Sequence, residues 1–318
     1  MGAGRAGAVE LEPFATRNQS PLVAVHGLPP AESGATVPPG RLDVRVSLDA
    51  ANHFAADRAE DELVRLDGES YRITGALRYG LPGGLEVGVD VPWVAHTGGV
   101  ADGFIEAWHR WFGLPGNGRD EVERGRLDFL YLGDGDKVHL DRSSQGLGDV
   151  RVTLAVPLPT GPRRGRRFWA ARAGLKLPTG ASGSRLRGSG GTDLSLALAA
   201  TDRATLAPWG VVLHASGGVA WLGRGEVLAE RRRRLVGFGS ATVGWSPAEL
   251  LGFQVQLDAH TAPYRSRVDP LGSGSVQLVL GGTLALPGAA RLELAVVEDV
   301  AVDTAPDVVF HLALRKRF

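Results

Sequence analysis

The sequence predicts an all-β protein: a transmembrane antiparallel β-barrel of about twelve strands, with short periplasmic turns and longer extracellular loops. Three observations predict this fold. Apolar and polar residues alternate with a period of two in segments of about ten residues, enough for a tilted strand to cross a bilayer. The connections between the segments are short and long in turn, and tryptophan and tyrosine residues lie near segment ends.

The composition is that of a folded chain without a dominant charge. Of 318 residues, 43% are hydrophobic and 45 are glycine, and 35 Lys and Arg balance 35 Asp and Glu. Because clustered excess positive charge drives binding to phosphates, we expect no nucleic-acid partner. The absence of cysteine excludes disulfide scaffolds, thiolate metal sites and cysteine nucleophiles. No apolar run reaches the length of a transmembrane helix, about 18 residues, which leaves alternating strands as the way to cross a membrane.

Each alternating segment has one apolar and one polar face. In the first, Leu42, Val44 and Val46 share one face, and Arg45 and Asp49 share the other. The same pattern recurs along the chain, and it predicts strands at 41–49, 71–79, 85–93, 149–156, 169–177, 193–198, 209–221, 241–245, 253–260, 276–286, 291–299 and 308–315.

The connections sort by length. Short turns that contain Pro or Gly are expected at 81–84, 159–162, 201–208, 247–250 and 287–289. Longer polar loops are expected at 54–68, 95–146, 178–191, 223–235, 263–273 and 303–307. A soluble sandwich has no reason to sort its loops in this way, whereas an even-stranded barrel does, with both termini on the periplasmic side. We therefore predict an N-terminal segment, 1–39, followed by the barrel, 40–318.

The two ends of the sequence add further expectations. Residues 1–12 lack the apolar run of a signal peptide, so either there is none or the chain is a mature form. The last strand ends on Phe318, in register with Phe310, Leu312 and Leu314. A final amphipathic strand with a terminal aromatic residue resembles the signal read by the bacterial barrel-assembly machinery, which we expect as a partner.

Two sets of motifs resemble known outer-membrane families. Residues 17–22, Arg-Asn-Gln-Ser-Pro-Leu, ahead of the first strand, resemble a Gram-negative barrel family known as domain of unknown function 3187. The Gly-Leu-Gly-Asp motif at 146–149 and the Leu-Pro-Thr-Gly motifs at 158–161 and 177–180 are similar to those of barrel proteins regarded as transporters in aromatic-degradation gene clusters. The resemblance implies a barrel in the bacterial cell outer membrane and brings no established activity.

The polar faces predict a lumen with charges of both signs. The residues that we expect to line it and to contact a solute are Arg45, Arg72, Asp90, Arg151, Arg172, Asp193, His214, Asp258, His260 and Arg315. In a narrow barrel such charges either line a solute path or bridge across a closed lumen, and both interpretations stay open.

The segment before the first strand has its own turn residues. Residues 13–39 include Arg17, Asn18, Gln19 and a stretch with two prolines at 29 and 30. A segment of this length either folds into the barrel as a plug or hangs below it as a periplasmic tail.

The outer loops suggest contacts with the membrane. In the longest loop, Ile105, Trp108, Trp111 and Phe112 fall on one helical face, which predicts a foot on the outer leaflet, a lid over the mouth, or ordinary packing on the rim. Residues 126–132 and 137–141 predict a hairpin above the membrane. The run of four arginines at 231–234 either contacts lipopolysaccharide phosphates or is solvated.

One pair of residues is typical of an enzyme. His214 and Ser216 could serve a lipid hydrolase, but the alternation turns both into the lumen and supplies no acid to orient the histidine. We expect no enzyme, no catalytic residue, no metal and no cofactor. The favoured function is a channel or transporter that binds or passes a small solute, a hydrophobic one among the options. The alternatives are a closed barrel that acts through its outer loops on lipopolysaccharide or another envelope protein, and a lipid hydrolase.

Overall fold

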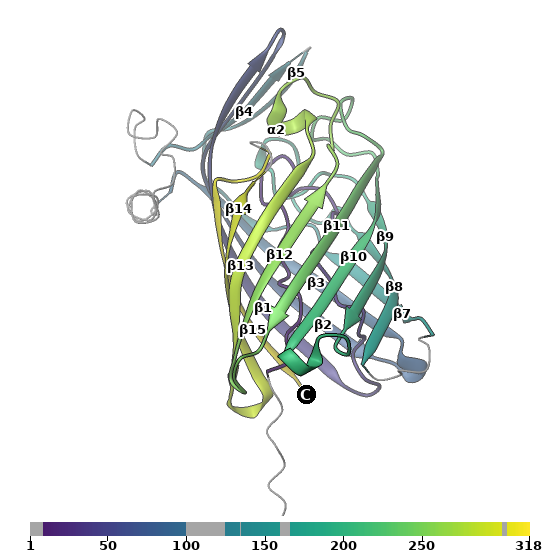
Figure 1. Cartoon of the computed structure of the whole chain (residues 1–318). Helices are drawn as coiled ribbons and strands as arrows, with labels where there is room; N and C mark the ends of the chain where they lie inside the picture. The colour runs from purple at the N-terminus through teal and green to yellow at the C-terminus, as the bar shows by residue number, and fades with distance from the viewer. Residues whose placement is uncertain (1–8, 100–124, 134, 160–165, 301–303) are drawn as a thin grey trace, which may run out of the picture.

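A computed structural model describes residues 9–99, 125–133, 135–159, 166–300 and 304–318. They form a closed antiparallel barrel of twelve strands, as predicted (Figure 1). The barrel strands are β1 (Leu42–Ala59), β2 (Glu62–Gly80), β3 (Glu86–Thr97), β7 (Arg151–Pro157), β8 (Arg167–Lys176), β9 (Asp193–Asp202), β10 (Val211–Leu222), β11 (Leu235–Trp245), β12 (Leu251–His260), β13 (Ser275–Leu286), β14 (Ala290–Asp299) and β15 (Val308–Arg317).

Each barrel strand pairs with its neighbours in chain order. The sheet closes between the first and the last strand, where Asp43 of β1 lies opposite Arg317 of β15 and Asn52 lies opposite Val308. Between β3 and β7 the chain adds three short strands, β4 (Asp128–Gly133), β5 (Asp136–Leu140) and β6 (Ser144–Leu147). Closure leaves no free edge along the main wall, as a membrane-spanning sheet requires.

The two ends of the barrel differ. At one end, which we call the turn end, β2 and β3 are joined through η1 (Pro82–Gly84), β9 and β10 through η4 (Ala207–Trp209), and β13 and β14 through η5 (Pro287–Ala289). The C-terminus lies at this end (Figure 1). The opposite end, the loop end, carries the longer connections, which include η3 (Gly183–Arg185) and α2 (Asp269–Gly272).

The predicted loop at 54–68 is wrong. β1 and β2 continue through this region and stay paired up to Ala59 opposite Glu62, so that only two residues form the turn. The alternation persists because Val64 and Leu66 are buried in an apolar cluster that also contains Phe129 of β4, the strand that pairs with this part of β2. The hairpin expected at 126–141 is present as β4 and β5, which project beyond the loop end in Figure 1.

The outer wall is apolar and suited to lipid. Large aliphatic side chains in the middle of the strands are exposed, Val255 among them at 49%. Aromatic side chains exposed near the ends of the strands flank this band: Trp93 and Trp221 toward the loop end, and Tyr79, Trp169, Trp245 and Phe253 toward the turn end. The arrangement matches the aromatic girdles of transmembrane barrels. Within the described residues, no helix is long and apolar enough to cross a membrane.

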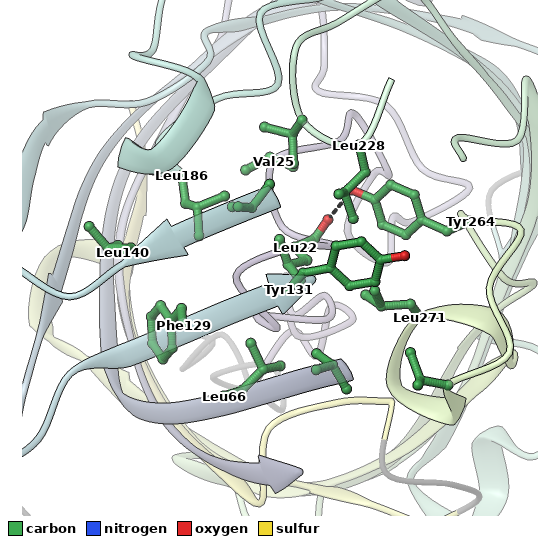
Figure 2. Packing of buried hydrophobic residues seen from close by; sticks show 14 of the residues in the cluster. Leu22, Val25, Leu66, Phe129, Tyr131, Leu140, Leu186, Leu228, Tyr264 and Leu271 are labelled. Atoms are coloured by element: carbon green, nitrogen blue, oxygen red, sulfur yellow. Dashed lines mark hydrogen bonds between the residues drawn. The ribbon is translucent and has the colours of Figure 1, made fainter. Parts of the chain in front are cut away.

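An apolar cluster lies across the loop end, and we call it the loop-end cluster. It brings together side chains from the N-terminal segment, from β2, from the β4–β5 hairpin and from three loops (Figure 2). Its members are Leu22, Val25, Val64, Leu66, Leu127, Phe129, Tyr131, Val138, Leu140, Leu186, Val227, Leu228, Tyr264, Val268 and Leu271. Inside a polar lumen these residues can escape water only by packing on one another.

Candidate functional site

Residues 9–39, called the N-terminal segment from here on, run through the inside of the barrel (Figure 1). Its apolar side chains are buried, with Phe14 fully inaccessible and packed in a cluster with Val279, Val297 and Val309. Near the loop end, Tyr264 donates a hydrogen bond of 2.6 Å to the carbonyl of Leu22. The segment therefore contacts the lumen over most of its length.

Polar side chains of the barrel wall form hydrogen bonds with the backbone of this segment, as a neighbouring strand would in a sheet. The side-chain amide of Gln256 accepts from the N–H of Phe14 and donates to its carbonyl, each at 3.0 Å. Thr16 donates to Asp258 at 2.6 Å, and the N–H of Gly27 donates to Asp193 at 2.8 Å. The bonds to Phe14 and Gly27 satisfy buried backbone groups that would otherwise be costly, and the bond from Thr16 joins two side chains.

Arg172 and Glu86 form a cradle for residues 33–37. The guanidinium of Arg172 lies 2.9 Å from Glu86, and it donates to the carbonyls of Ser33 at 2.8 Å and Ala35 at 3.0 Å. The other oxygen of Glu86 accepts from the N–H of Val37 at 2.8 Å. A planar guanidinium suits this task because its donors are fixed in a fork.

All ten predicted lumen residues lie on inward-facing positions of the strands. Seven are nearly inaccessible, namely Arg72, Asp90, Arg151, Arg172, Asp193, His214 and Asp258, and three are half-buried, namely Arg45, His260 and Arg315. Several of them form ion pairs inside the lumen, which is what the interpretation of paired charges expects. Arg151, for example, lies 3.4 Å from Glu32 and 3.6 Å from Asp90. Contact of the ten residues with a solute stays a prediction.

The three residues singled out in the N-terminal segment lie inside the barrel. Asn18 is hydrogen-bonded to His260 at 2.9 Å and donates to the carbonyl of Thr304 at 2.9 Å. Gln19 accepts from Arg72 at 3.2 Å. Arg17 is half-buried. That these contacts close a channel remains a proposal.

His214 and Ser216 have separate partners. The Nδ1 atom of His214 lies 2.9 Å from Thr201, and the hydroxyl of Ser216 lies 2.7 Å from that of Ser240. No hydrogen bond joins His214 to Ser216 in the described part of the chain, and no group of three or more His, Cys, Asp or Glu there suits a metal ion. Ile105, Trp108, Trp111 and Phe112 fall outside the described residues.

A set of charges at the turn end was not predicted as a site. Glu10 lies 2.9 Å from Arg203 and 3.0 Å from Arg291, and Glu12 lies 2.8 Å from Arg203. Burial alone would raise the pKa of Glu10, but Arg203, Arg291 and Arg317 outweigh it and lower the pKa from 4.5 to about 2. In the sequence, this set of charges is indicated only by two acids, Glu10 and Glu12, that precede a barrel whose strands carry arginines.

Between the N-terminal segment and the wall lies a cavity of about 260 Å³, which we call the turn-end cavity. Its lining includes apolar residues, among them Pro13, Pro30, Val37 and Phe168. It also includes the charged residues Arg45, Arg78, Arg172, Arg203, Arg315, Arg317, Glu10, Glu12, Glu32, Asp43 and Glu86. The space can hold a small molecule that is both apolar and charged.

Comparison with solved structures returns an outer-membrane channel and a toluene transporter, among others. An outer-membrane channel of the COG4313 group from Pseudomonas putida F1 is 13% identical with a TM-score of 0.59, and the match covers 89% of this chain and 97% of that one. The Ralstonia pickettii toluene transporter TbuX is 11% identical with a TM-score of 0.44, over 97% of this chain and 99% of that one. At 13% identity, the likeness to the first of these concerns the fold alone.

Comparison at the level of sequence gives the family. No curated protein sequence matches the chain significantly. One family model, described as "Protein of unknown function (DUF3187)", matches residues 2–318. This agrees with the resemblance carried by residues 17–22. The chain belongs to the DUF3187 family of proteins.

Proposed function

We propose that this protein is a channel of the bacterial outer membrane that binds and passes a small solute, with the N-terminal segment as its plug. The turn end then faces the periplasm. The observation that carries the proposal is the turn-end cavity: the segment is held by noncovalent contacts yet leaves about 260 Å³ open beside it. A lumen that served only as a structural core would be expected to pack without such a space.

The loop-end cluster supports an entry for solutes with an apolar part. Most of its members come from loops and from the N-terminal segment rather than from the barrel wall, so it can rearrange without opening the barrel. Leu22 and Val25 link the cluster to the plug. A solute that displaces these contacts would open the mouth and loosen the segment together.

Deletion of residues 9–36 tests the proposal in planar bilayers. We expect the shortened chain to conduct more than the full chain, because the deletion removes the contacts that fill the lumen. The substitution Gly75→Ala serves as the control, since nothing lies within 4 Å of a β-carbon there. A lower gel mobility after boiling verifies that both variants form barrels. Unchanged conductance together with unchanged protease resistance would contradict the role as a plug.

A second candidate, action on lipopolysaccharide, rests on a hollow at the loop end. It has a volume of about 530 Å³, and Arg231, Arg233, Arg265 and Arg267 line it together with three acids, Glu60, Asp61 and Glu62. Guanidinium groups bind phosphate well, although Arg231 is already 2.7 Å from Glu62. Binding of purified lipopolysaccharide that falls in an Arg233→Gln, Arg265→Gln double variant, with conductance unaltered, would favour this function.

A further inference from the structure

One arginine in the turn-end cavity lacks a counter-ion. Arg45 lines the cavity from β1, and its Nε atom is buried without a hydrogen-bond partner. Within the described residues, no hydrogen bond or ion pair involves its guanidinium. Since buried donors without partners are costly, this group is prepared to bind an acceptor that the chain itself does not supply.

Two acids close to Arg45 already have arginine partners. Asp43, which shares the inward face of β1 with Arg45, accepts from Arg315 at 2.6 Å and from Arg317 at 3.3 Å. Asp90 pairs with Arg78 at 2.7 Å. Across the two ladders, Arg45 lies opposite Arg315 on β15 and opposite Ala76 on β2, and neither is a partner for a cation.

The other arginines of the cavity differ in this respect. Arg172, Arg203, Arg315 and Arg317 each lie within 3.6 Å of a carboxylate. No carboxylate therefore lies in contact with Arg45 among the described residues, and the cationic Arg315 opposite it adds a repulsion that a bound anion would relieve.

We propose that the turn-end cavity binds a small organic acid, with its carboxylate on Arg45 and its apolar body against Pro13, Pro30 and Phe168. This rests on the proposed function and names the class of solute. A guanidinium can hold a carboxylate through two parallel hydrogen bonds. The apolar part of the lining distinguishes such a solute from an inorganic anion, which would gain nothing from it.

Charges at longer range modify the site. Arg17, half-buried in the N-terminal segment, has no ion pair among the described residues, and its field adds to that of Arg45. Asp90 on β3 and, less strongly, Glu293 on β14 act in the opposite sense, although no ion pair joins either to Arg45. Asp90 is held by Arg78, whereas Glu293 can be changed without breaking an ion pair within the described residues. Removal of the Glu293 charge should therefore strengthen binding of a carboxylate.

Calorimetric titration of the detergent-purified full chain with hexanoate tests this site. We expect hexanoate to bind and the neutral hexanamide not to bind. Arg45→Gln should weaken hexanoate binding about tenfold or more, the usual effect of losing a charged hydrogen-bonding partner. Arg45→Lys should retain part of the affinity, Glu293→Gln should increase it, and Arg41→Gln, which alters an exposed arginine nearby, should leave it unchanged.

The outcomes separate the two proposals. Equal binding of hexanoate and hexanamide, no binding of either, or equal hexanoate affinity in the parent and Arg45→Gln would each overturn the carboxylate site, whatever the conductance. Binding that depends on Arg45 in a chain whose conductance does not respond to removal of the plug would support the site and contradict the channel.

Discussion

Gly34 lies so close to the barrel wall that a β-carbon on it would be 2.4 Å from the carbonyl oxygen of Phe168. The wall offers no flexible side chain to move aside, because the next contacts are backbone atoms of Ala200 at 2.8 Å. A larger residue here must push the N-terminal segment inward. Gly34→Val is therefore expected to destabilise the seated segment by about 1–3 kcal/mol.

Accessibility of one cysteine measures this effect. The chain has no cysteine, so Ala35→Cys provides a unique thiol beside Gly34. Gly34→Val should increase the rate at which a maleimide added at the turn end labels it. Gly75→Ala, an open position in the same barrel, should leave the rate unchanged. Equal rates in all three chains would show that close packing at Gly34 does not hold the segment.

Arg172→Gln should release residues 33–37. It removes the ion pair with Glu86 and the bonds to the carbonyls of Ser33 and Ala35, and it leaves Glu86 buried without its cation. Loss of one partner of a buried pair costs about 3–5 kcal/mol. Hydrogen exchange of the amides at 33–37 should rise in this variant. The control is Arg167→Gln, which removes an ion pair whose arginine side chain is 39% exposed and should change the exchange at 33–37 little. If the amides at 33–37 exchanged as slowly in Arg172→Gln as in the parent, the cradle would be refuted.

The contact of Glu10 with the turn end should weaken in acid. Its pKa is lowered from 4.5 to about 2, so the charged form is stabilised by folding. That stabilisation is complete above pH 4.5 and is lost as the pH falls from about 4.5 through 2. A spin label on Val9→Cys should become more mobile over this range. In Glu10→Gln the label should already be mobile at neutral pH and should vary less with pH.

The position of Val255 on the outer face, near the middle of the bilayer, can be tested by arginine substitution. Val255 lies in the middle of β12 with 49% of its side chain exposed, whereas Leu250 lies in the turn before that strand. Arginine at the bilayer midplane costs about 2–4 kcal/mol in a barrel, and about 0–1 near the interface. Val255→Arg should therefore lower the free energy of unfolding in lipid vesicles much more than Leu250→Arg. Equal losses would place the two residues at similar depth.

The period-two pattern was sufficient to predict the strands and the faces of the wall. Leu42 and Val44 against Arg45 and Asp49 exemplify why: each residue contacts either lipid or lumen, so a local rule determines its type. The same rule failed at 54–68, where polar residues alternate with Val64 and Leu66. There β2 pairs with a hairpin from more than sixty residues later, at 128–140, and shares a buried apolar face with it, which no local pattern reveals.

The sequence could not predict which charged side chains pair with each other inside the lumen. Arg172 and Glu86 lie on strands separated by β7, and their match depends on the register of two ladders. The absence of an ion pair at Arg45 among the described residues is harder still to predict. It depends on Asp43 accepting hydrogen bonds from Arg315 and Arg317 across the contact between β1 and β15. Such choices among many charges depend on geometry, and the residue types alone are compatible with several pairings.

The position of the N-terminal segment bears on how the chain assembles. Phe14 and Thr16 bond Gln256 and Asp258, residues 242 positions later in the chain, so these contacts require strands that are synthesised long after the segment itself. Contacts between residues so distant in sequence form slowly. The segment is therefore made before the strands that hold it and becomes ordered after them, and closure of β1 onto β15 has to enclose it. A barrel that sealed before the segment had entered would leave it outside.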